Sequence, residues 1–359
     1  MVVLTHDVDP QGDLVVVLGM PNSTNLIPKV YIKKCWSGIS YFIRDWDIFN
    51  VPKVKSILQA VDDPVLVHKV RFRVSSHHMK MASPVFAKML DGPWSESNSL
   101  NSSSTPASLG NNSAVRPREV TAHSWDADAL LVVLNVIHGI NDQVPREVSV
   151  DFLVEIAGVV DYYHCQRAMQ LAGEVWRQKV YEFPVKYGKG CISWLFISWA
   201  FGWEGVSSQL ASFIIAHGQG LSHIKSDELP VTSILGKFDK KRQEYIAKIM
   251  TRLDEVAEDL LNGRAGCNNE CSSMLLGSLM RRRHASALLN FTHPSPYTNY
   301  SVNDFIKETL VVCTIELGSI KRKRSDTPHT CNIAAMMKPF LKETWEEIRR
   351  FKISDLQDK

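Results

Sequence analysis

The chain has 359 residues, of which 45% are hydrophobic and 22% are charged, and its formal net charge is +3. This balance is typical of a globular protein and is too weakly basic to indicate nucleic-acid binding. The first residues lack the basic and apolar regions of a signal peptide, and the longest apolar run, residues 191–203, is too short to span a bilayer. We therefore expect an intracellular protein, of the cytoplasm or nucleus, without a membrane or nucleic-acid partner.

The N-terminal half predicts a few strands followed by helices. Residues 13–19, 69–76 and 118–124 are short β-rich runs, and in the second of them apolar residues alternate with arginine, as in a half-buried strand. Helices are expected over residues 126–139, 149–165 and 167–180, the first with an acidic start and a terminal glycine. This order is typical of an α+β domain.

Residues 72–90, "FRVSSHHMKMASPVFAKML", predict a strand followed by two short helices. Serine is a good N-cap and proline a good first helical residue, so Ser83 and Pro84 should end one helix and begin the next. Met79 is the expected buried residue of the first helix, which Ser75 or Ser76 should cap.

The histidines and serines of this stretch do not indicate catalysis. Neighbouring helical residues such as His77 and His78 point about 100° apart, whereas a chelating pair needs a spacing of three or four residues. Ser75 and Ser76 lie in no nucleophile motif, and the chain contains no G-x-S-x-G, HExxH or P-loop sequence. We therefore expect no enzymatic activity.

From residue 182 onward the sequence predicts a mostly helical region. Its clearest element, residues 239–263, repeats apolar residues every seven positions and ends at a glycine. The stripe indicates either packing within its own domain or a short coiled-coil seam, and two heptads favour packing. The basic run at residues 281–284, "RRRH", is interpreted as the favourable cationic end of a helix.

The seven cysteines are expected to be thiols or ligands rather than disulfides. Cys267 and Cys271 would lie one helical turn apart, and His329 and Cys331 could meet them in the fold. Three thiolates and an imidazole suit structural zinc, although the spacing is not that of a standard finger. The alternative is that these four residues have ordinary packing or surface roles, with no cofactor.

A compact basic cluster is formed by Lys321, Arg322, Lys323 and Arg324. Such a run can be a nuclear-import signal or a site that contacts phosphate groups. The alternative is a solvated loop. Upstream, residues 95–114 are rich in serine and asparagine and are expected to form a flexible loop.

The motifs of the N-terminal half, taken together, resemble a BTB/POZ domain. Ser83 and Phe86 match the Ser-x-x-Phe with which the second helix of the family's helical pair opens, and "IHG" at residues 137–139 is similar to its Y-x-G turn. The sequence is most similar to those of a large fungal group of BTB proteins of mostly undefined function. Their C-terminal halves carry a C-x-x-x-C piece, "LLGSL" and a late H-x-C, as this chain does.

The resemblance implies a BTB/POZ domain at residues 1–181, a small sheet flanked by a helical cluster, and a helical region at residues 182–359. Residues 20–69 fall inside what should be a tight strand hairpin, so we expect either an insertion or a gene-model artefact such as a translated intron. A loop this long costs only about 2 kcal/mol in closure entropy, so the fold could accommodate it.

The resemblance implies a non-enzymatic protein interaction module, commonly a homodimer formed through the first helices and an exposed strand. Met79 and Phe86 would hold the helix pair that meets the partner. One alternative is a cullin ubiquitin-ligase adaptor, because Trp94-Ser95-Glu96 fits the family's hydrophobic-x-Glu tripeptide. Another alternative is a nuclear regulator that uses the basic cluster.

Overall fold

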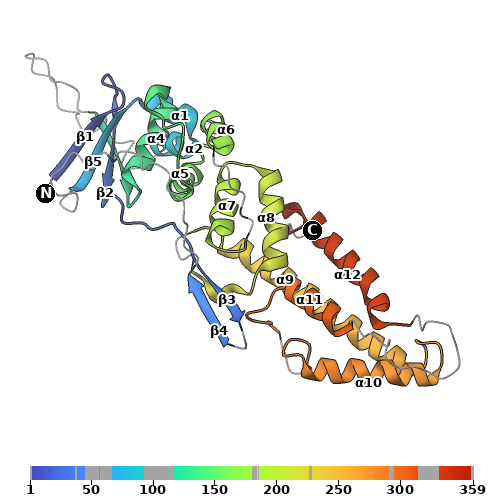
Figure 1. Cartoon of the computed structure of the whole chain (residues 1–359). Helices are drawn as coiled ribbons and strands as arrows, with labels where there is room; N and C mark the ends of the chain where they lie inside the picture. The colour runs from blue at the N-terminus through green and yellow to red at the C-terminus, as the bar shows by residue number, and fades with distance from the viewer. Residues whose placement is uncertain are drawn as a thin grey trace, which may run out of the picture.

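The computed structural model describes residues 2–36, 39–44, 56, 67–92, 117–179, 184, 186–225, 229–290, 295–313 and 331–356. These residues form a mixed α+β structure with eleven α-helices, in which a small sheet leads through a helical cluster into an elongated array of helices (Figure 1). Among the described helices, none combines the length and apolarity needed to cross a membrane.

The main sheet has the strand order β1-β5-β2-β6, formed by β1 (Val2–Asp7), β2 (Leu14–Gly19), β5 (Val67–Val74) and β6 (Arg118–His123). β2 is antiparallel to β5 and parallel to β6, while β1 pairs with β5 in parallel. The strands predicted at β2, β5 and β6 are confirmed. β1 was not predicted, because its six residues owe their conformation to a partner distant in sequence.

β2 is buried on both faces. Leu14, Val16 and Leu18 have no exposed surface, and Val15 and Val17 on the opposite face are only 5% and 7% exposed. Arg71 of β5 pairs with Val17 and Glu119 of β6 pairs with Val15, and the two charged side chains form an ion pair. Their stems therefore extend over β2 from either side and shield its valines from water.

The helix pair α1 (Ser76–Ala82) and α2 (Pro84–Asp91) begins and ends as predicted. The Ser75 side chain caps α1, and the Ser83 hydroxyl oxygen accepts a hydrogen bond from the Phe86 amide at 3.1 Å. The same hydroxyl donates to the carbonyl oxygen of Tyr163 at 2.5 Å. This serine therefore both starts α2 and fixes it to the end of α5.

Three further helices of the N-terminal half are confirmed: α4 (Ala127–Ile137), α5 (Val150–Tyr163) and α6 (Gln170–Lys179). Asp126 caps α4 by accepting from the Ala129 amide at 2.8 Å, and Gly139 ends it with a φ of +74°. α5 packs against α2 and α4 of the N-terminal half and against α7 (Lys189–Ala200) of the C-terminal half. It therefore lies between the N-terminal helices and the first helix of the C-terminal half.

Part of the 20–69 segment is built into the fold. β3 (Lys29–Trp36) pairs with β4 (Ile39–Arg44) and with β7 (Ile224–Lys225), making a second small sheet. Leu26 is 5% exposed and lies against Gly158 of α5, where a side chain on the glycine would collide with it. These residues thus have defined places in the structure, and the identification of the segment as an insertion or an artefact stays a prediction.

The helical C-terminal half is confirmed for its described residues. After α7, a buried helix that contains most of the apolar run, come α8 (Glu204–His217), α9 (Thr232–Leu261), α10 (Asn269–Ala285), α11 (Val302–Cys313) and α12 (Ile333–Arg350). α9 packs against α8, α10, α11 and α12. Its predicted stripe is buried within the chain, as expected of intradomain packing: Ile246, Ile249, Leu253, Val256 and Leu260.

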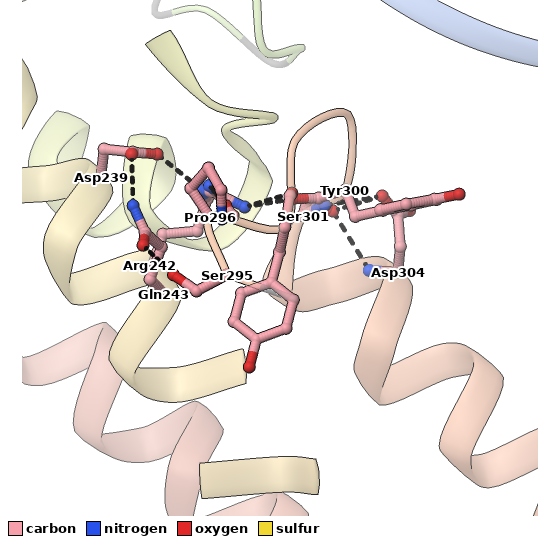
Figure 2. Close-up of polar contacts among 9 residues, drawn as sticks. Asp239, Arg242, Gln243, Ser295, Pro296, Tyr300, Ser301 and Asp304 are labelled. Carbon is pink, nitrogen blue, oxygen red and sulfur yellow. Dashed lines mark hydrogen bonds and ion pairs between the residues drawn. The ribbon is translucent and has the colours of Figure 1, made fainter. Parts of the chain in front are cut away.

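One cation interrupts this apolar stripe. Arg242 is 1% exposed and lies between Phe238 and Ile246 on the buried face of α9. Its Nε donates to Asp239 at 2.7 Å (Figure 2). Its terminal nitrogens donate to three backbone carbonyl oxygens at 2.6 to 3.0 Å, those of Pro296, Tyr297 and Tyr300. Arg242 therefore fastens the segment before α11 to α9.

The basic run at residues 281–284 ends α10, as predicted, and contains a second buried arginine. Arg283 is 1% exposed, donates to the Leu289 carbonyl oxygen at 2.9 Å and forms an ion pair with Asp254 of α9. It continues the buried stripe of α10 at a spacing of four residues from Leu279. The other three members of the run are exposed, whereas Arg283 is an internal link between α9 and α10.

His138 joins the end of α4 to the start of α1. Its Nε2 accepts a hydrogen bond from the Ser75 amide at 2.9 Å, so its Nδ1 carries the proton and donates to the Leu134 carbonyl oxygen at 2.8 Å. Only a neutral imidazole can make both bonds. Burial lowers the pKa of His138, and the adjacent His78 ring, 5.2 Å away between centroids, acts in the same direction.

We expect the free energy of unfolding to decrease as the pH is lowered, because of His138. Its folded-state pKa lies below the ordinary value of 6.5, so the stabilisation is complete above that value and is lost as pH falls through the folded pKa. Urea unfolding between about pH 7.5 and pH 5 measures this slope. His138→Gln should flatten it, although burial also lowers the pKa of His217 and leaves part of the slope. The exposed His77→Gln is the control, and equal slopes in both variants would contradict the expectation.

Candidate metal centre

Three cysteine side chains converge at the starts of α10 and α12. Both helix starts lie at the end of the helical array away from the main sheet (Figure 1). The sulfur atoms of Cys267, Cys271 and Cys331 all lie within 4.8 Å of one another. Zn–S bonds of about 2.3 Å in a tetrahedral site place neighbouring sulfurs about 3.8 Å apart. The observed spacing therefore needs only a small contraction to enclose a metal ion.

Two helix starts position these thiols. Asn268 caps α10 by accepting from the Cys271 amide at 2.8 Å, and Asn332 caps α12 by accepting from the Ala335 amide at 2.6 Å. Cys267 and Cys331 each come directly before one of these capping asparagines. The positive ends of both helices consequently lie beside the sulfurs, where they stabilise thiolates.

The three thiols differ in burial. Cys271 is 4% exposed, Cys331 is half-buried and Cys267 is exposed. Desolvation, together with the neighbouring Cys271 and Cys267, raises the pKa of Cys331. The cluster is thus partly closed by protein on one side and reachable from solvent at Cys267.

The sequence predicted four ligands, and the structure brings three of them together. His329 lies outside the described residues, so its role stays a prediction. The six cysteines whose side chains are described are not in disulfides, as expected. The repeated Cys-Asn pair, at residues 267–268 and 331–332, is the sequence signal that would have linked the two helix starts in advance.

The residues predicted to contact partners are placed only in part. Met79 and Phe86 are 0% and 1% exposed, so they can act on a partner only by positioning the helix pair. Met81, which was not predicted, is 75% exposed on the same helix as Met79. Trp94 and Glu96 lie outside the described residues, as does the basic cluster at residues 321–324.

A small cavity beside Arg242 is a second location to consider for ligand binding. Its lining combines apolar side chains of α8, α9 and the segment between them with Tyr187, Asp239 and Arg242 as its charged or polar members. Arg242 already gives four hydrogen bonds to the protein. The guanidinium therefore serves the packing of α9, and the cysteine cluster is the stronger candidate for a functional site.

No protein-family model, curated protein or solved structure matches this chain. The resemblance to BTB/POZ domains therefore stays a prediction from the motifs of the N-terminal half. The geometry of the cysteine cluster does not depend on that resemblance, because it is given by the positions of the three sulfur atoms in the structure.

Proposed function

We propose that this chain is a non-enzymatic protein interaction module that self-associates through a surface formed by strand β1 and helix α1. The observation that carries the proposal is the position of β1 at the end of the main sheet, where its outer edge pairs with no described strand. Such an edge can accept a strand from another molecule through backbone hydrogen bonds. The strand, "VVLTHD", contains neither of the residues that most often protect an edge, lysine and proline.

Each of the two elements carries an exposed apolar side chain. Val3 of β1 is 49% exposed and Met81 of α1 is 75% exposed. α1 begins directly after β5, the strand to which β1 is bonded, and Asp7 at the end of β1 pairs with Arg73 near the end of β5. The start of α1 therefore lies near the end of β1.

The order of elements also supports the proposal. An antiparallel strand pair, a helix pair opened by Ser83 and Phe86, a third strand and an acidic-capped helix follow one another as in the BTB/POZ pattern. Members of that family commonly dimerise through their first helices and an exposed strand. The same elements carry Met81 and Val3 here.

Size-exclusion chromatography with light scattering tests the proposal. We expect a dimer at micromolar concentration, with Met81→Glu and Val3→Lys each weakening association by about tenfold or more, a loss of roughly 1.4 kcal/mol. Leu171→Glu is the matched control, because Leu171 is 78% exposed but lies on α6. A wild-type chain that stays monomeric, or a control variant that dissociates as readily as Met81→Glu, would count against this surface.

A further inference from the structure

We propose that Cys267, Cys271 and Cys331 bind a structural Zn²⁺ ion that fastens the start of α10 to the start of α12. Their sulfur atoms share one small volume, within 4.8 Å of one another, although the third comes from a distant part of the sequence. Packing alone does not require three cysteine sulfur atoms to lie this close together. The proposal concerns the C-terminal half and is independent of the proposed self-association.

The donor set determines which metal fits. Among the described histidine, cysteine and acidic side chains, this cluster contains three thiols and no carboxylate. Calcium and magnesium require oxygen ligands, whereas thiolate sulfur favours zinc and other soft ions. An iron–sulfur cluster ordinarily uses four protein ligands. Three sulfurs beside two helix N-termini suit a zinc ion, whose net charge with three thiolates is −1 and is favoured by the positive helix ends.

The location indicates a structural role. α10 packs along α9 and α11, and α12 packs along α8, α9 and α11. A shared metal would add a direct link between the first turns of α10 and α12. Because this link closes a long stretch of chain, it would restrict the unfolded state and so favour the folded one. The three described thiols carry the proposal, and it does not depend on His329.

Metal analysis of the purified full-length chain is the first test. We expect elemental mass spectrometry to find about one zinc ion per chain. After replacement of zinc with Co²⁺, we expect an absorption band from sulfur-to-cobalt charge transfer. Removal of zinc with a chelator should lower the melting temperature by several degrees, and added Zn²⁺ should restore it. A chain that takes up no zinc at micromolar Zn²⁺, or one that contains a disulfide between two of these cysteines in place of metal, would overturn the proposal.

Cys267→Ser gives the sharpest test, because the side chain is exposed and its loss should otherwise be nearly neutral. We expect this variant to bind zinc at least about tenfold more weakly and to lower the melting temperature of the zinc form, but not that of the chelated form. Cys313→Ala removes a buried thiol outside the cluster and should keep full zinc content. Wild-type zinc affinity in Cys267→Ser would overturn the assignment, even if variants of the buried Cys271 fail to fold.

Discussion

Replacing Arg242 with methionine is expected to lower the free energy of unfolding by about 3–5 kcal/mol. The substitution keeps the apolar stem but leaves Asp239, which is only 14% exposed, without its cation. It also leaves three backbone carbonyl oxygens without the guanidinium donors that they now accept from. Buried acceptors that lose their donors cost the full desolvation penalty. Urea unfolding monitored by circular dichroism measures the change.

Arg252→Met is the matched control, because Arg252 also forms an ion pair with the residue three positions away on α9. That pair, with Glu255 at 2.8 Å, has side chains that are 32% and 52% exposed, whereas those of the Arg242 pair are 2% and 14% exposed. Exposed pairs contribute about 0–1 kcal/mol, so the control should unfold nearly as the wild type does. Arg242→Lys should retain part of the stability, since an ammonium keeps the charge but not the planar fork. Similar losses for Arg242 and Arg252 would show that the carbonyl contacts do not matter.

Phe86→Ala is expected to lower the free energy of unfolding by about 3–5 kcal/mol. Phe86 is 1% exposed and stacks on Tyr163 with ring centroids 4.5 Å apart and an interplanar angle of 17°. The removed ring would leave a cavity between α2 and α5, next to the hydrogen bond from Ser83 to the Tyr163 carbonyl oxygen. Chemical unfolding gives the loss directly.

The control for Phe86→Ala lies in the same helix pair. Met81→Ala removes a side chain that is 75% exposed, so it should change the free energy of unfolding by about 0.5 kcal/mol or less. If the proposed surface is correct, this variant weakens self-association without loss of stability, whereas Phe86→Ala affects both. A loss below about 1 kcal/mol for Phe86→Ala would mean that the packing between α2 and α5 is looser than the stacked rings indicate.

Local signals explain which elements could be predicted. Ser83-Pro84 marks a helix boundary through the chemistry of two residues, and Asp126 and Gly139 mark the ends of α4 in the same way. β1 and the second sheet carry weaker local signals, because strands gain their hydrogen bonds from partners that lie elsewhere in the chain. Those pairings become apparent only in three dimensions.

Among the polar residues, too, some are indicated by the sequence and others only by the structure. The chemistry of thiolates predicts a metal site at the cysteines, and the structure brings Cys267, Cys271 and Cys331 together. Arg242 and Arg283 were not recognised as buried, although each is a cation on an otherwise apolar helical stripe. The stripe could have identified the positions. The stripe does not indicate which carbonyl oxygens accept hydrogen bonds from the two arginines, because those oxygens belong to other segments of the chain.

The position of α5 has a consequence for how the chain can be divided. Leu153, Ile156 and Val160 have no exposed surface, because the helix is covered by α2 and α4 on the N-terminal side and by α7 on the C-terminal side. A fragment that ended before α7 would expose apolar side chains of α5 to water and become prone to aggregation. We therefore expect the two halves to unfold together, despite the boundary that the sequence suggests between them.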